Sequence, residues 1–225
     1  MDRESQRVVI VGAGGLGREA LQTIRDQIRA GASVSIVGFL VDPEFDAPPC
    51  VKGVPVYRKL EAFTNDPTVR FVIAIGDPVA RARYAARIMS RAGRRFASIV
   101  HPSSLLSDTV AVGSGTIILQ AASITTDVQI GAHTVVNPHA SIAHDCVLED
   151  FVSLAPGVAL AGGVHVETGC EIGTGAVVIP RQRIGHWSII GAGAVVIGRV
   201  QPNSTMVGVP ARCISSRPAG WQHQV

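Results

Sequence analysis

An aliphatic residue recurs at every sixth position through the second half of this chain. Steps of six from Leu106 to Val196 meet sixteen positions, and each of them holds Leu, Val or Ile. The residue two positions earlier is often small or aliphatic too, as at Ala122 and Val152. Residues two apart point to the same side of a strand, so both sets are expected to point inward. Such a fixed period is typical of a solenoid, in which stacked repeats share one core.

The six-residue period predicts a short strand followed by a corner. An α-helix does not explain it, because six residues rotate around a helix by more than half a turn. Three sides close a coil of about eighteen residues, and this pattern resembles the left-handed parallel β-helix of hexapeptide repeats. We place the β-helix at residues 101–214 and a tail at 215–225. Glycine follows the inward aliphatic at several corners, where we expect positive φ angles: Gly113, Gly131, Gly173, Gly185 and Gly191.

Residues 1–100 have the pattern of a separate α/β domain of the Rossmann type. The buried-strand run "RVVIV" leads into the glycine loop "GAGGLG" and a helical stretch that ends at Gly31. A second strand ends at Asp42, and "RFVIAIG" predicts another strand, followed by a helix that Asp77 and Pro78 open. The run "RFASIV" is expected to close the sheet before the boundary at His101.

The glycine loop points to a phosphate-bearing ligand. Backbone amides at the start of a helix accept phosphate, and an acidic residue that ends the second strand, here Asp42, can hold ribose hydroxyls. The domain has too few strands for a whole dinucleotide fold, which favours a mononucleotide or a nucleotide-linked substrate. An NAD-binding protein and a tightly packed turn without a ligand remain the alternatives.

Composition predicts a cytoplasmic enzyme or scaffold. The chain starts without the layout of a signal peptide, and no apolar run approaches the length of a membrane span. The formal charge is +3. Arginines crowd one predicted helix between Arg81 and Arg95, and we interpret them as a solvated helix face rather than a surface for polyanions. No nucleic acid partner is therefore expected.

The densest group of reactive side chains in the coils lies in "NPHASIAHDC". His144 is the third residue of its hexad and is therefore expected at a corner, where an imidazole can act as a general base. A carboxylate at Asp145 would raise its basicity if it points the same way. A zinc site with His139 is disfavoured, since Ser103 occupies the position expected for a third ligand. A solvated surface histidine is the remaining alternative.

The motifs of the two domains together resemble one enzyme family. "GAGGLG", "GFLVD" and "IAIGD" precede "IVHPSS", and the coils carry "VVNPHASIAHDCVLEDFVSLAPGVALAGGV" and a terminal "VGVPAR". This combination resembles the acetyltransferases of bacterial surface-sugar biosynthesis over residues 7–214. That family includes nucleotide-aminosugar N-acetyltransferases and sialic acid O-acetyltransferases. The motifs of either domain alone would be weak evidence for this family, whereas their joint occurrence in one chain is specific for it.

The resemblance implies a homotrimer with active sites between neighbouring β-helices, acetyl-CoA along the groove and no metal. It makes His144 the general base and Asp145 the residue that raises its basicity, and the N-terminal domain is expected to hold the nucleotide of an aminosugar. The matching substrate positions are Gly14, Gly15, Leu16, Asp42, Gly76 and Asn137. The matching CoA positions are Ser153, Gly162, Thr174, Ala192 and Arg212.

Three positions depart from the pattern of that family. Leu16 stands where a histidine often follows the glycines, Val41 precedes Asp42 where paired acids are frequent, and Ser153 replaces a second histidine. A serine hydroxyl can still donate to a thioester carbonyl, which keeps Ser153 as a CoA candidate. The identity of the sugar and of its nucleotide stays open, as does the choice between N- and O-acetylation. A non-enzymatic trimeric scaffold is the other alternative.

Overall fold

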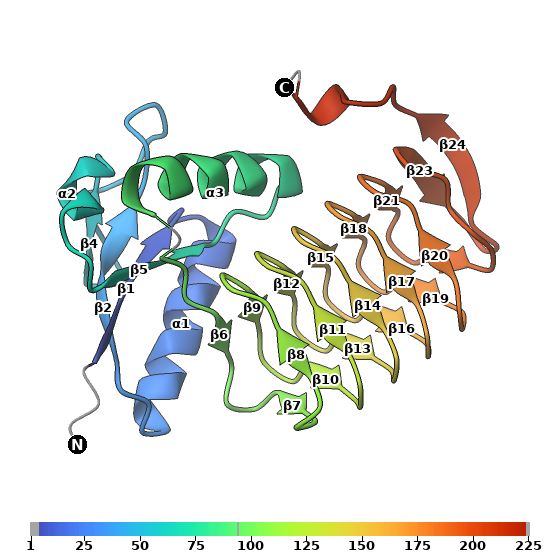
Figure 1. Cartoon of the computed structure of the whole chain (residues 1–225), viewed down its shortest axis with the longest axis horizontal. Helices are drawn as coiled ribbons and strands as arrows, with labels where there is room; N and C mark the ends of the chain where they lie inside the picture. Colours follow the sequence, from blue (N-terminus) through green and yellow to red (C-terminus); the bar gives the residue numbers. More distant parts are fainter. Residues whose placement is uncertain (1–4, 94, 224–225) are drawn as a thin grey trace.

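The computed structural model describes residues 5–93 and 95–223 and has two joined bodies, an α/β domain and a long parallel β-helix (Figure 1). The α/β domain holds a five-stranded sheet in the order β3-β4-β2-β1-β5, in which only β3 runs antiparallel to its neighbour. Its elements are β1 (Gln6–Val11), α1 (Gly15–Arg29), β2 (Val34–Leu40), β3 (Cys50–Val51), β4 (Val54–Tyr57), α2 (Glu61–Thr64), β5 (Val69–Ile73) and α3 (Pro78–Ala92).

Alternation along β1 places the two long helices on opposite sides of the sheet. Val8 and Ile10 share a buried cluster with Leu21 of α1, whereas Val9 shares another with Ile88 of α3. Successive strand residues point to opposite faces, so one continuous apolar run supplies both packing surfaces. The strand order reverses beside β1, between β2 and β5, which is where sheets of this kind bind ligands.

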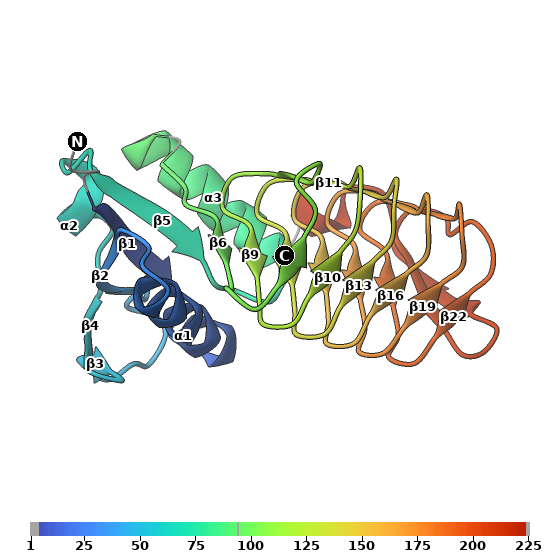
Figure 2. The ribbon, with the colours of Figure 1, turned by 90° about the horizontal axis from the view of Figure 1, so that it is seen from below.

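The β-helix has three flat faces, which we number in chain order (Figure 2). The first face contains β6 (Ile99–Val100), β9 (Ile117–Ile118), β12 (Val135–Val136), β15 (Ser153–Leu154), β18 (Glu171–Ile172), β21 (Ile189–Ile190), β23 (Ser204–Val207) and β24 (Arg212–Ser216). The second contains β7 (Leu105–Leu106), β10 (Ser123–Ile124), β13 (Ser141–Ile142), β16 (Ala159–Leu160), β19 (Val177–Val178) and β22 (Val195–Val196). The third contains β8 (Ala111–Val112), β11 (Gln129–Ile130), β14 (Val147–Leu148), β17 (His165–Val166) and β20 (Arg183–Ile184).

The aliphatic ladder forms the core of the β-helix, as the period predicts. Each ladder residue from Ile118 to Val196 is buried, and each strand pairs in parallel with the strand one coil away, as Ile124 does with Ile142. The intervening positions also point inward, among them Cys146 and Cys170, which are buried free thiols. Sequence spacing alone therefore predicts the core.

The corner glycines do not have the role that the sequence suggested. Positive φ recurs every six residues from Gly115 to Gly193, three positions after the ladder residue and not one. The predicted glycines, such as Gly113 and Gly131, have no positive φ. A Cβ at any of the five would lie 2.4 to 2.8 Å from an atom of a neighbouring coil. These glycines are needed because the coils stack closely.

The α/β domain docks on the first face of the β-helix. Ile117 and Val135 share a buried cluster with Ala20 and Leu21 of α1. The run "RFASIV" was predicted to form the last strand of the α/β sheet, and this prediction is wrong because the run is split between the two bodies. Phe96 alone bridges to β5, whereas Ile99–Val100 already pairs with the next coil, before the predicted boundary at residue 101.

The chain after the coils folds back onto the β-helix. β24 runs antiparallel to β23 and precedes a short 3-10 helix, Trp221–His223. The Arg217 guanidinium lies 4.1 Å from the centre of the Trp221 ring, and the indole donates to Asn203 at 3.1 Å. The predicted tail thus includes a strand end and an anchored turn, neither of which has a periodic pattern.

Candidate active site

A cavity of about 680 Å³ lies at the carboxyl ends of the central strands of the α/β domain. Val11, Leu40 and Ala74 line its floor, next to the glycine loop. Of the predicted substrate residues, Gly14, Gly15, Leu16, Asp42 and Gly76 all line this cavity. Its position at the reversal of strand order is the usual ligand site of such sheets.

The glycines of the loop serve two different purposes. Gly12 has φ +95°, and a Cβ on Gly17 would lie 2.1 Å from the Gly12 carbonyl oxygen, so both are required for the tight turn. Gly14 and Gly15 have no atom within 4 Å of a Cβ position. The backbone N–H groups in the first turn of a helix have no carbonyl acceptor within that helix, and this holds for α1. This end of α1 can therefore bind an anionic group.

Asp42 lines the cavity as predicted, but its carboxylate already has partners. Arg87 donates to both oxygens, at 2.5 and 2.6 Å, and the Tyr84 hydroxyl donates to Oδ2 at 2.6 Å. The hydrogen bonds from Arg87, and less so that from Tyr84, lower the pKa of Asp42 against the opposing effect of burial. Asp42 thus has little acceptor capacity left for a ribose.

The arginines of α3 are not the uniform solvated face that the sequence suggested. Arg81 is fully buried, and Arg87 pairs with Asp42. Arg83 and Arg91 are exposed, as predicted, and Arg94 lies outside the described residues. Composition counts a buried arginine and an exposed arginine alike, so it could not separate Arg81 from Arg83.

His144 and Asp145 form a hydrogen-bonded pair at the corner between the second and third faces. The turn follows β13, and Asp145 takes the positive φ of that corner, 60°. The Asp145 Oδ2 atom lies 2.7 Å from the His144 Nδ1 atom. Because a carboxylate only accepts, Nδ1 carries the hydrogen and Nε2 has the free lone pair. The side chain of His144 is 65% exposed, so this nitrogen is available to a ligand.

Gly162 lies one coil beyond His144 and supports its ring. A Cβ on Gly162 would lie 2.6 Å from Cε1 and 2.7 Å from Nε2 of the imidazole. The ring therefore occupies the space that a side chain would need. Gly162 was predicted to meet the CoA arm, and its position beside Nε2 is compatible with that.

The other predicted residues lie away from this corner. Asn137, Thr174 and Ala192 share the corner between the first and second faces, where the Asn137 amide donates to the Leu154 carbonyl at 2.7 Å. Ser153 is buried under α3, and Arg212 is exposed on β24 at the end of the β-helix. At this corner, a single chain therefore brings together His144, Asp145 and Gly162 among the predicted residues.

Neither a metal site nor a membrane span is found in the described part of the chain. No group of three or more His, Cys, Asp or Glu side chains among residues 5–93 and 95–223 could hold a metal ion. In the same residues, no helix is both long and apolar enough to cross a bilayer.

Comparison with known sequences finds a matching family model and a curated relative. Residues 7–88 match the family model of the PglD N-terminal domain. UDP-N-acetylbacillosamine N-acetyltransferase of Bacillus subtilis (strain 168) is 37% identical over 123 residues. That match spans 51% of this chain and 51% of the relative, so the chain aligns with about half the length of that curated protein.

Solved structures match almost the whole chain. A histidine variant of perosamine N-acetyltransferase from Caulobacter crescentus, in complex with CoA and GDP-perosamine, is 31% identical. The match has a TM-score of 0.83 and covers 93% of this chain and 97% of that one. WeeI from Acinetobacter baumannii AYE is 29% identical, with a TM-score of 0.81 over 92% of this chain and 99% of that one.

The fold is that of the hexapeptide-repeat acyltransferases that carry a Rossmann-like N-terminal domain. The matches over nearly the full length are to proteins that share both bodies in the same order. The chain belongs to the family of sugar N-acetyltransferases that join this domain to a left-handed β-helix.

Proposed function

We propose that this protein transfers an acetyl group from acetyl-CoA to the amino group of a nucleotide-linked sugar, for the synthesis of a surface polysaccharide or glycan. The observation that carries this proposal is the His144–Asp145 pair, which leaves the His144 Nε2 atom basic and accessible at a corner of the β-helix. Two of the relatives named above support this acceptor: the Bacillus subtilis protein is a UDP-N-acetylbacillosamine N-acetyltransferase, and the Caulobacter crescentus enzyme is bound to GDP-perosamine. This favours an amine acceptor over a hydroxyl.

His144 acts as the general base in this reaction. Its Nε2 atom takes a proton from the sugar amine as the new nitrogen–carbon bond forms at the thioester carbonyl. Asp145 stabilises the resulting imidazolium through Nδ1. When the carbon–sulfur bond breaks, His144 returns the proton to the departing thiolate. A backbone amide beside the corner stabilises the oxyanion of the tetrahedral intermediate.

The coils beyond His144 suit an extended acyl carrier. Gly162 and Gly198 lie on the same column of the corner as His144, and the neighbouring Ile197 is 50% exposed. Coils stack at about 4.8 Å, so Gly198 is about 14 Å beyond the imidazole. We assign the carrier arm to this strip, with Thr174, Ala192 and Arg212 as contacts from the adjoining subunit.

The α/β cavity is the site for the nucleotide of the sugar. The open amides beside Gly14 and Gly15 are placed to bind a phosphate, and Leu16 and Gly76 line the adjoining wall.

The cysteines favour a cytoplasmic location. All four are free thiols, and two of them are exposed. Free thiols persist in a reducing compartment such as the cytoplasm.

The two halves of the site come from different chains. The cavity domain docks on the first face, whereas His144 lies at the corner opposite that face. The outer side of the second face is exposed and partly apolar, with Leu105 at 71% and Val177 at 38% exposed. A cyclic trimer covers such a face and brings the His144 corner of one chain beside the cavity of the next.

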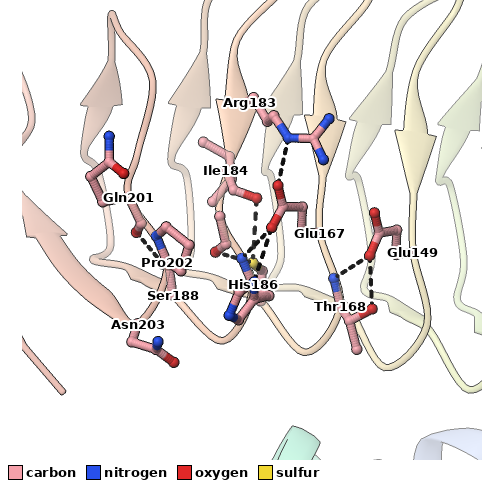
Figure 3. A network of polar contacts seen from close by, with 12 residues as sticks. Glu149, Glu167, Thr168, Arg183, Ile184, His186, Ser188, Gln201, Pro202 and Asn203 are labelled. Atoms are coloured by element: carbon pink, nitrogen blue, oxygen red, sulfur yellow. Dashed lines mark hydrogen bonds and ion pairs between the residues drawn. The ribbon is translucent and has the colours of Figure 1, made fainter. Parts of the chain in front are cut away.

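Turnover by His144→Ala tests this assignment. With acetyl-CoA and a panel of UDP-, dTDP- and GDP-aminosugars, we expect the best substrate to lose about two to four orders of magnitude in kcat. His186 is the matched control, because it is another corner histidine whose Nδ1 atom meets a carboxylate, that of Glu167 (Figure 3). His186→Ala should keep the wild-type rate. An active His144→Ala enzyme would remove this residue from the mechanism.

A further inference from the structure

The largest fully buried side chain of the molecule is that of Arg81, which leaves α3 and enters the junction between the two bodies. Its exposed fraction is 0%. A buried guanidinium costs free energy unless each donor has a partner. The partners of Arg81 therefore show what the junction is built to hold.

One side of the guanidinium holds the wall of the nucleotide cavity. The Nη1 atom donates to the carbonyl oxygens of Ile75 and Gly76, at 2.7 and 2.9 Å. These two residues connect β5 to α3 and line the cavity. The position of this loop depends on Arg81.

The other side of the guanidinium holds two successive coils of the β-helix. The Nε atom donates to the His133 carbonyl at 2.7 Å, and the Nη2 atom donates to the Phe151 carbonyl and to the Ser153 hydroxyl, both at 2.8 Å. The five N–H groups thus all have acceptors. A lysine has three donors on a single nitrogen and cannot reproduce this planar fork.

We propose that Arg81 is a positioning residue. It fixes the distance between the coils of the β-helix and the loop from β5 to α3, here called the cavity loop. The inference rests on the proposed function, in which the α/β domain holds the nucleotide and the β-helices hold the acetyl donor. Most of the nucleotide cavity, including the amide end of α1, lies outside this loop, so loss of Arg81 should lower nucleotide affinity far less than kcat. The reaction joins the two bodies, so a small shift of the loop moves the sugar amine away from the thioester.

Ser153 belongs to this junction and not to a carrier groove. Its hydroxyl accepts from Arg81 and lies 3.4 Å from the Gly76 carbonyl oxygen. This arrangement places one coil side chain directly against the cavity loop. It also gives a reason for a small hydroxyl residue at a buried position of the first face.

Kinetics of Arg81→Lys and Arg81→Met, with nucleotide binding measured separately, test the proposal. The binding probe is whichever of UDP, dTDP and GDP the wild-type enzyme binds most tightly by calorimetry. We expect kcat to fall about 10- to 100-fold, as displacements near 1 Å can cause, while the nucleotide Kd stays within about threefold. Lys should retain more activity than Met. Amide exchange should rise at residues 75–77 and stay unchanged in α1.

Arg83→Met is the matched control, because Arg83 is an exposed arginine on the same helix. It should leave kcat, Kd and amide exchange unchanged. If the Arg81 variants do not fold, Ser153→Ala tests the proposal instead. We expect this variant to lose kcat several-fold and to keep the wild-type nucleotide Kd. Two results would overturn the role of Arg81. One is a folded Arg81 variant with wild-type kcat and wild-type amide exchange, and the other is a variant that loses kcat and nucleotide affinity equally. An inactive wild-type enzyme would count against the proposed function, and the exchange data would still decide the role of Arg81.

Discussion

The imidazole of His144 rests on the bare backbone of Gly162, and this contact defines where its reactive nitrogen lies. A Cβ on Gly162 would approach the ring to 2.6 Å, which no packed pair of atoms tolerates. The ring is exposed on its other sides, so it can rotate away from a side chain introduced there. Activity is therefore more sensitive to this position than stability is.

Gly162→Ala should lower kcat by about 10- to 100-fold, because it displaces the general base. Its melting temperature should stay close to that of the wild type, since Gly162 has no positive φ. Kinetics and thermal melting of Gly162→Ala check this prediction. A wild-type kcat, or a melting temperature that falls together with kcat, would contradict it.

The junction between the bodies includes a cluster of three rings at the corner between the third and first faces. The His133 ring lies 4.4 Å from that of Phe96 and 5.2 Å from that of Phe151. Burial, and then the charge of Arg81, lower the pKa of His133 to about 4, with Asp150 opposing them. The imidazole is thus neutral in the folded protein at neutral pH.

The stability of the protein should depend on pH through His133. Between the folded pKa of about 4 and the ordinary value of 6.5, the unfolded chain binds more protons than the folded one. The free energy of unfolding therefore falls as pH drops through this window, by about 3 kcal/mol in total. In His133→Phe this contribution should vanish. Urea unfolding at pH 4.5 and 7 measures it, and equal pH dependence in both proteins would contradict the assignment.

How far the sequence predicts these elements depends on the range of the interactions. The aliphatic ladder predicts the core, and the position of His144 in its hexad predicts its corner, because both follow from a local period. The positive φ positions were misplaced, since Ala, Asp, His, Phe, Arg and Trp occupy many of them as well as Gly. The contact between Arg81 and Ser153 spans 72 residues of sequence, and no local pattern indicates it.

At the scale of the whole molecule, the cavity and the corner of His144 are separated by the body of the β-helix. The α/β domain packs against the first coils of the first face (Figure 1). The corner of His144, between the second and third faces, is opposite the first face. Asn137, Thr174 and Ala192 lie at a third location, across the second face from His144. The predicted site residues thus form one site only if a second chain adjoins the first. The sequence alone indicated this arrangement only through its resemblance to a family.

Mixed trimers of two inactive variants test this shared site most directly. His144→Ala removes the proposed base, and Gly15→Glu places a negative charge at the open end of α1, which is the proposed phosphate site. Co-expression with two different tags and purification on both yields trimers that contain both chains. In a cyclic trimer, each mixed assembly has one site with an intact cavity and an intact neighbouring His144. We predict that the doubly purified protein regains about one third of the wild-type kcat, whereas an inactive mixture would contradict a site shared between chains.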